Sequence, residues 1–477
     1  MRPSPTWFRT LLPAAIAASA LGCSERALPP GAAPEVPGAV LGASHGENRG
    51  DGEDAVREGR RTFRFETFGD EAFWSGTLRL HEAVAGAAHG GVGPGVSPRT
   101  ALSVGLKVDA EALPATLRRA IRAGQVDLDD PATTLALLRL DAVVGVKGAF
   151  DSQGSLRSMG ITCALCHSTV DGSFAPGIGR RLDGWANRDL DVGAIVGLSP
   201  DLQPVADLLS LSGTPVDVPT VKQVLASWGP GKYDAALFLD GKGLRPDGKP
   251  AAVLIPSAFG LAGVNLHTWT GWGSVTHWNA LVANLEMHGQ GTFDDARLDD
   301  AATFPVAARA GSGHVRPPEG KPDLVTPRLA ALHAYQLSLP PPRPPEGFFD
   351  EAAARRGAAV FSGKGKCATC HVPPLFTEPG WNLHAPAELA IDDFQANRSP
   401  DRRYRTAPLR GLFARFPGGP PPASLAAEPG PFFHDGRFAT LRDVVRHYDE
   451  TGVGAGGVPL GLSEGEVDDL VQYLRSL

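Results

Sequence analysis

The last part of the chain carries apolar side chains at helical spacing. Apolar positions recur every three or four residues over 467–474, which is the period of one helix face. Ser463 and Glu466 stand ahead of them with the spacing of a capping box, in which each side chain binds the backbone N–H of the other residue. We therefore predict a C-terminal amphipathic helix. Its apolar face consists of Val467, Leu470, Val471 and Leu474.

Two earlier segments combine a helix cap with an apolar face. Asp130 and Pro131 are typical of an N-cap and a first helical residue, and apolar positions continue from there toward Gly145. Asp350 caps a second predicted helix over residues 351–361. These patterns predict a mainly helical fold. The apolar face of the first helix consists of Leu135, Leu138, Val143 and Val144, and that of the second includes Gly357 and Phe361.

Composition adds long loops to this picture. The chain contains 58 Gly and 43 Pro, while 42% of its residues are hydrophobic, so we expect many turns around a substantial core. The Pro-rich run 339–345 cannot be helical inside and predicts a stiff connector. The aromatic clusters Phe63-Arg64-Phe65 and Phe73-Trp74 are predicted to be core. The formal charge of -7 makes nucleic acid an improbable partner and a basic protein a more natural one.

The N-terminus has the layout of an export signal. Arg2 and Arg9 precede an apolar stretch over 11–22, which is too short to span a membrane as a helix. This order of charged and then apolar residues is typical of a secretory signal. We therefore predict that the protein is exported.

Cys23 follows the apolar stretch directly. The run that ends at Cys23 resembles a bacterial lipoprotein signal, whose cysteine becomes the lipidated first residue of the mature chain. The alternative is an ordinary signal peptide that happens to contain a cysteine. Ser24 after the cysteine favours the outer membrane. We predict a signal peptide over 1–23, a flexible tether over 24–54, and a periplasmic protein held at the membrane by a lipid anchor only.

The chain contains two copies of the Cys-x-x-Cys-His sequence that attaches c-type haem: Cys163, Cys166 and His167, and Cys367, Cys370 and His371. In each copy the thiols add to the haem vinyl groups and the histidine binds the iron. A redox disulfide needs only one cysteine pair, and a four-cysteine zinc site needs neither histidine. We therefore predict two covalently bound c-type haems, with His167 and His371 as iron ligands.

The haem motifs suggest how the chain is divided. We expect a mainly α fold with two cytochrome c-like haem domains, long loops and an N-terminal extension. The predicted extension covers 55–150, the first haem domain 151–340 and the second haem domain 341–477.

Residues around and after the second motif resemble the bacterial dihaem cytochrome c peroxidases, including their relative that matures a tryptophan-derived quinone cofactor. The block 433–441 is similar to the family's Tyr/Phe-x-His-Asp-Gly motif and the helix after it, and 406–410 is similar to its Thr-x-Pro-x-Leu-Arg segment. The resemblance is best from about Arg356 to the end. A weaker resemblance, over 177–185, is to the dihaem oxygenases that cleave rubber.

The resemblance implies a sixth ligand for the second haem iron. The peroxidases place a Met in the helix after the His-Asp-Gly motif, and the corresponding position here is Tyr448. The quinone-maturing relative uses a Tyr for this purpose. His447 is the alternative ligand, and a buried tyrosine with a hydrogen-bonded hydroxyl is the other interpretation of Tyr448.

The first haem lacks the family's distal histidine. The corresponding stretch 177–180 contains no His. This departure implies either an open first iron or a ligand from His267, His277 or His288. A lone histidine is more often a structural hydrogen-bonding group than a ligand, so none of the three is assigned.

Two further segments resemble family elements. Residues 268–271 are similar to Phe-Trp-Asp-Gly and residues 284–287 to Pro-x-Glu-Met. The resemblance implies that Trp269 relays electrons between the haems and that Glu286 acts as acid and base over the first iron. The alternatives are that Trp269 packs in a core with neighbouring tryptophans and that Glu286 lies on a solvated helix face.

The family often holds calcium between its haem domains. Thr406 and Pro408 match two of its carbonyl ligands, and Asp217 lies where an Asn contributes. The resemblance therefore implies a calcium site at these three residues, with oxygen ligands of the kind that calcium prefers.

These observations favour an oxidoreductase. The leading hypothesis is reduction of hydrogen peroxide at the first haem, with electrons that enter from a small redox protein through the second haem. One alternative is a non-catalytic electron-transfer cytochrome in which both irons are six-coordinate. Another is a dihaem oxygenase or oxidase that uses oxygen on an organic substrate.

Overall fold

The computed structural model describes residues 45–420, 424 and 426–477, with side chains from residue 52 onward. Residues 49–477 form one compact unit. The predicted signal peptide, Cys23 and most of the predicted tether lie outside the described residues. Within the described part, every helix is too short or too polar to cross a membrane.

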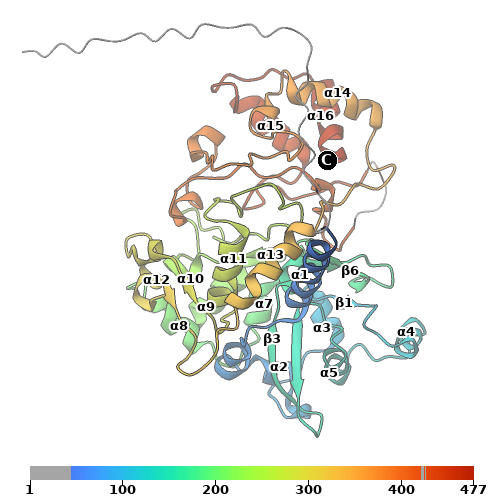
Figure 1. Ribbon diagram of the computed structural model, residues 1–477, viewed down its shortest axis with the longest axis vertical. Helices are drawn as coiled ribbons and strands as arrows, with labels where there is room; N and C mark the ends of the chain where they lie inside the picture. The colour runs from blue at the N-terminus through green and yellow to red at the C-terminus, as the bar shows by residue number, and fades with distance from the viewer. Residues whose placement is uncertain (1–44, 421–423, 425) are drawn as a thin grey trace, which may run out of the picture. The chain divides into compact units, whose positions relative to one another are not determined.

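The described chain is mainly helical, with five small sheets of two strands each (Figure 1). The α-helices are α1 (His45–Phe65), α2 (Leu80–Ala85), α3 (Pro98–Ser103), α4 (Ala115–Arg122), α5 (Pro131–Arg139), α6 (Ala164–His167), α7 (Val192–Val196), α8 (Gln203–Ser210), α9 (Val218–Trp228), α10 (Leu237–Asp240), α11 (Val275–Leu281), α12 (Pro305–Ala310), α13 (Leu329–Ser338), α14 (Glu351–Ser362), α15 (Leu441–Thr451) and α16 (Glu464–Ser476). The strands are β1 (Val108–Asp109), β2 (Val146–Phe150), β3 (Leu156–Ile161), β4 (Ser168–Val170), β5 (Ile178–Gly179), β6 (Arg181–Asp183), β7 (Lys232–Tyr233), β8 (Val253–Leu254), β9 (Phe293–Asp294) and β10 (His314–Val315). β1 and β5 are parallel, and the other four pairs, β2–β3, β4–β6, β7–β8 and β9–β10, are antiparallel.

The predicted helix caps are confirmed. Asp350 accepts the N–H of Ala353 at the start of α14, and Ser463 with Glu466 forms the capping box of α16. Asp130 caps α5, but this helix ends at Arg139. Val143 and Val144, which were expected on its apolar face, are therefore buried beyond the helix.

A β-hairpin leads into the first haem motif. β2 and β3 pair antiparallel, and β3 ends at Ile161, two residues before Cys163. The N–H of Thr162 donates to the carbonyl of Gly145 at 2.9 Å. Gly145 has a φ of 80°, and a β-carbon there would overlap the backbone of Leu165. The hairpin thus fixes the position of α6.

The buried hydrophobic side chains form separate cores. The largest core combines residues 74–146 with residues 156–255, so it crosses the boundary predicted near 150. A separate core, drawn from 361–474, lies within the predicted second haem domain. There α14 packs against α16, where Gly357 lets the backbone of Asp469 approach closely (Figure 1).

Only part of the two predicted aromatic clusters is buried. Phe63 and Trp74 are buried as predicted, whereas Phe65 is 39% exposed and contacts Lys147 and Arg181 through its ring.

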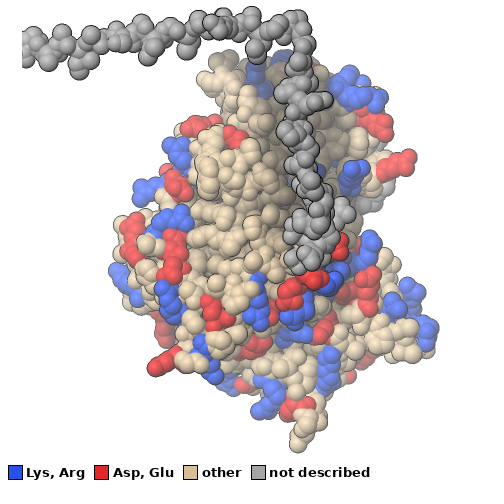
Figure 2. Space-filling model, in the orientation of Figure 1, with Lys and Arg blue, Asp and Glu red and all other residues tan. Residues whose placement is uncertain are grey.

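The Pro-rich run 339–345 follows the end of α13 and is not helical, as predicted. On the face shown in Figure 2, Lys and Arg are interspersed with Asp and Glu around a largely uncharged central region.

Candidate functional site

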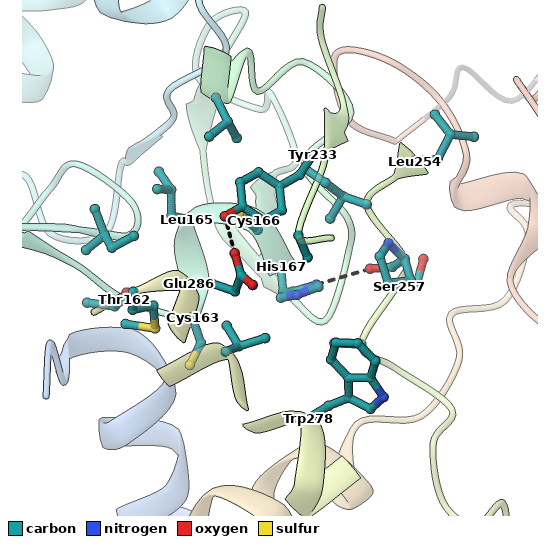
Figure 3. Close-up of a pocket in the computed structure, with 18 of the residues that line it drawn as sticks. Thr162, Cys163, Leu165, Cys166, His167, Tyr233, Leu254, Ser257, Trp278 and Glu286 are labelled. Atoms are coloured by element: carbon teal, nitrogen blue, oxygen red, sulfur yellow. Dashed lines mark hydrogen bonds between the residues drawn. The ribbon is translucent and has the colours of Figure 1, made fainter. Parts of the chain in front are cut away.

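The first haem motif consists of Cys163 and the α6 residues that follow it, and it lines a cavity of about 380 Å³ (Figure 3). The Nδ1 of His167 lies 3.1 Å from the carbonyl oxygen of Pro256, to which it donates as a neutral imidazole. Burial lowers the pKa of His167 to about 4, which keeps the ring neutral. Because the backbone holds Nδ1, Nε2 is left to bind a metal. The ring therefore has the tautomer that an axial iron ligand requires.

The two thiols of this motif line the same cavity. Cys163 and Cys166 are free, as are Cys367 and Cys370, so no disulfide joins the cysteines of the described residues. Burial raises the pKa of Cys163 and of Cys166 to about 12, so both remain protonated. Two free thiols beside the available Nε2 of His167, at the wall of one cavity, fit covalent attachment of a haem.

Glu286 points into this cavity from the end of a π-helical turn, η3 (Val282–Glu286), which continues α11. Its side chain is buried, which excludes the solvated helix face considered above. One carboxylate oxygen accepts the hydroxyl of Tyr233, and Oε1 has no hydrogen-bond partner among the described residues (Figure 3). Burial raises the pKa of Glu286 to about 8. The group can therefore hold or release a proton near neutral pH.

Tyr233 is a site residue that the sequence did not indicate. It lies on β7, 53 positions before Glu286, and burial raises its pKa well above the ordinary value. β7 pairs with β8 through two residue pairs only. A strand this short gives almost no periodic signal. No local pattern links the tyrosine to its carboxylate partner.

Trp269 lies where the first haem segment meets the C-terminal segment. Its Nε1 donates to the carbonyl of Leu254 at 2.8 Å, and the N–H of Leu254 donates to the carbonyl of His434 at 2.7 Å. The carbonyl of Trp269 also accepts the N–H of Arg405 at 3.0 Å. Trp269 lines the first cavity as well. This position suits the predicted relay between two haems, which itself stays a prediction.

The second haem motif has the same histidine arrangement. Cys367 lies in η6 (Cys367–Thr369), and His371 follows Cys370. The Nδ1 of His371 lies 3.2 Å from the carbonyl of Phe376, and burial lowers the pKa of His371 to about 4. Burial raises the pKa of Cys367 to about 11. The residues of this motif thus also fit a covalently attached haem with a histidine ligand.

Tyr448 lies on α15 beside the second motif. Burial, followed by the nearby Cys367 and Cys370 thiols, raises the pKa of Tyr448. His447 instead places Nε2 at 3.1 Å from the carbonyl of Leu389, so that nitrogen already has a partner. The geometry favours Tyr448 over His447 as a ligand to the second iron.

The three histidines considered for the first iron lie in different surroundings. His267 lines the first cavity, with Nε2 at 3.0 Å from the carbonyl of Val264. His277 has Nε2 at 3.5 Å from a carboxylate oxygen of Asp295. His288 stacks on Phe73, with ring centroids 3.5 Å apart. Each has a structural contact, so none is singled out as an iron ligand.

The three residues expected to bind calcium already have other contacts. Asp217 is exposed at the N-terminus of α9, where its carboxylate accepts the N–H of Thr220 at 2.9 Å. The carbonyl of Thr406 accepts the Thr377 hydroxyl at 2.5 Å and Nε of Arg405 at 3.3 Å. Pro408 lines the first cavity. These contacts neither bring the three residues together nor exclude a calcium ion, so the calcium site stays a prediction.

Comparison with known proteins gives two partial sequence matches. No family model matches the chain. It is 30% identical over 167 residues, 32% of this chain, to the methylamine utilization protein MauG of Methylorubrum extorquens. It is 32% identical over 154 residues, 26% of this chain, to the cytochrome-c peroxidase IdrP1 of Denitromonas iodatirespirans. The chain spans only 43% and 40% of the length of these curated relatives.

Solved structures give weaker likenesses. The diheme peroxidase BthA from Burkholderia thailandensis is 18% identical, with a TM-score of 0.31 over 58% of this chain and 86% of that chain. A MauG-like protein associated with microbial copper homeostasis is 21% identical, with a TM-score of 0.30 over 50% of this chain and 77% of that chain. The sequence matches, rather than these structural ones, therefore relate the chain to known proteins.

Proposed function

We propose, on the premise that the chain is related to the bacterial dihaem cytochrome c peroxidases, that it is a dihaem oxidoreductase that reduces hydrogen peroxide. The observation that carries this proposal is Glu286, a buried acid with one unpartnered oxygen in the same cavity as Cys163, Cys166 and His167. Electron transfer alone does not require an acid at that place, whereas cleavage of peroxide does.

Each motif would hold one haem through its own residues. Cys163 and Cys166 would attach the first haem and His167 would bind its iron. The second haem would be held in the same way by Cys367, Cys370 and His371, with Tyr448 as the sixth ligand. The haems, when bound, supply the iron that reduces peroxide and carries electrons.

Glu286 moves the proton that peroxide cleavage requires. Its Oε1 would accept the proton of one peroxide oxygen and return it to the other, which leaves as water when the O–O bond breaks. Two electrons, supplied through the haems, and two further protons would convert the remaining oxygen into a second water. Tyr233 donates its hydroxyl hydrogen to the other carboxylate oxygen and so fixes the direction of Oε1. Tyr233 is thus a positioning residue, while Glu286 touches the substrate.

Electrons enter at the second motif and reach the first by way of Trp269. The hydrogen bonds from Trp269 to Leu254 and from Leu254 to His434 connect the segments of the two motifs. The donor is a small redox protein, and the net charge of -7 favours a basic one. The protein is exported and tethered to the outer membrane through lipid on Cys23.

Peroxide turnover by Glu286→Gln tests the proposal. The variant keeps the size of the side chain but cannot accept the proton, so we expect kcat for peroxide reduction to fall by about 100- to 10,000-fold. Haem content and the spectra of both haems should stay unchanged. The exposed Glu351→Gln is the matched control and should retain full activity.

Electron paramagnetic resonance of the oxidised protein separates this function from electron carriage. A high-spin ferric component marks an iron that is open to peroxide, as the proposal expects. Two haems that stay low-spin after partial reduction, together with no peroxide turnover, would overturn the proposal and leave an electron-transfer cytochrome.

A further inference from the structure

Two arginines of the described residues, the buried Arg188 and the half-buried Arg415, have no carboxylate partner among them. Arg188 is 7% exposed, and its Nη1 has no hydrogen-bond partner among the described residues. Arg415 lines the first cavity. Burial lowers the pKa of Arg188 to about 9 and that of Arg415 to about 10, and the charge of Arg415 lowers the pKa of Arg188 further. Arg415 thus forms part of the cavity wall, and Arg188 lies within the range of its charge.

Arg398 and Arg181 are buried and paired with carboxylates, whereas Arg405, which also lines the first cavity, contacts only backbone carbonyls. Arg398 lies 3.0 Å from a carboxylate oxygen of Asp234 and 2.8 Å from one of Asp240. Arg181 lies 3.2 Å from Asp109. Burial of a cation is costly without a counter-charge, and two adjacent cations increase that cost. Among the described residues, no carboxylate supplies this counter-charge to Arg188 or Arg415. A bound anion would supply it.

The arginine pair lies beside the first haem motif. The N–H of Asn187, the residue before Arg188, donates to the carbonyl of Cys166 at 2.9 Å. The guanidinium carbon of Arg415 lies 5.7 Å from the ring centroid of Trp269. Arg188 thus follows a residue that contacts the first motif, and Arg415 lies against the predicted relay tryptophan.

We propose that Arg188 and Arg415 together bind a propionate carboxylate of the first haem. The proposal rests on haem attachment as proposed above, but not on peroxide reduction. Haem has vinyl groups for the two cysteines and carboxylates at its polar edge, and these carboxylates need cationic partners when they are buried. A guanidinium group donates two parallel hydrogen bonds to a carboxylate, which suits an arginine pair to this task. The carboxylate removes the repulsion between the two arginines.

The test compares the haem-loaded wild-type protein with Arg188→Gln and Arg415→Gln. We expect the propionate bending band of the first haem in resonance Raman spectra to shift in both variants. We also expect the midpoint potential of the first haem to fall, because a nearby positive charge has been removed. Arg355→Gln, at an exposed arginine on α14, is the matched control and should change neither.

Charge-conserving variants cover a failure to fold. If Arg415→Gln does not accumulate with haem, Arg415→Lys takes its place beside Arg188→Gln in the test, because lysine keeps the charge but loses the paired hydrogen bonds. We expect Arg415→Lys to shift the Raman band of the first haem and to change its midpoint potential less than Arg188→Gln does. Unchanged bands and potentials in the variants that fold, or changes confined to the second haem, would overturn the proposal. None of these measurements needs peroxide, so a protein without peroxidase activity can still confirm the carboxylate site.

Discussion

At the scale of single residues, the histidines of the two haem motifs are oriented by different means. His167 is held by the carbonyl of Pro256, 89 positions away, whereas His371 is held by that of Phe376, five positions away. The second ligand is thus positioned by its own loop. The first depends on the folding of a distant segment, so we infer that its orientation is lost earlier when the structure loosens.

The pKa of Glu286 gives a pH dependence with a definite sign. Burial raises this pKa to about 8, so below that pH the group is mostly protonated and cannot accept the substrate proton. We expect kcat to rise as the pH increases through about 8. Glu286→Gln should lose this rise in kcat and keep only a low activity that does not change with pH. A profile measured from pH 5 to about 10 on both proteins checks this.

Tyr233→Phe should move the rise of kcat with pH, described above for Glu286, without abolishing it. The hydrogen bond from Tyr233 stabilises the carboxylate and lowers the pKa of Glu286, against the larger effect of burial. Its loss should therefore shift the rise to higher pH. Haem spectra should stay as in the wild-type protein. A rise that stays in place would show that Tyr233 does not act through Glu286.

At the scale of elements, the packing of α14 on α16 depends on one glycine. A β-carbon at Gly357 would overlap the carbonyl oxygen of Asp469, whereas one at Gly465 would meet nothing within 4 Å. We expect Gly357→Ala to destabilise the fold by about 1 to 3 kcal/mol through overpacking. Gly465→Ala, the control on α16, should be neutral or stabilise by up to about 1 kcal/mol. Thermal unfolding of both variants gives the comparison, and equal melting temperatures would contradict it.

The sequence predicts features that depend on neighbouring residues, but not those that depend on contacts between distant segments. The caps of α14 and α16 and the two haem motifs were predictable because each depends on residues within a few positions. The end of α5 was not, because Val143 and Val144 are buried outside the helix and so imitate its period. The pairing of Tyr233 with Glu286 was missed because only tertiary contacts bring them together. Glu286 itself was found through a resemblance and not through any periodic pattern.

At the scale of the whole molecule, Trp269 is hydrogen-bonded to Leu254, which in turn is hydrogen-bonded to His434 in the segment after the second haem motif. If it relays electrons, Trp269→Phe should slow oxidation of the second haem after peroxide is added to the reduced protein, because phenylalanine is harder to oxidise and lacks the indole N–H. Stopped-flow spectroscopy at the absorbance of each haem measures this. Trp381→Phe is the matched control, since Trp381 is 72% exposed. Equal rates in the two variants would rule out the relay.

The wall of the first cavity also has a consequence for biosynthesis. Its residues range from Trp74 to Arg415, so the cavity is complete only when most of the chain has been made and folded. The thiols of Cys163 and Cys166 are half-buried in this wall, which is built from segments far apart in the sequence. We therefore expect a haem held by this motif to be added before those segments close around it, and premature folding to hinder its attachment.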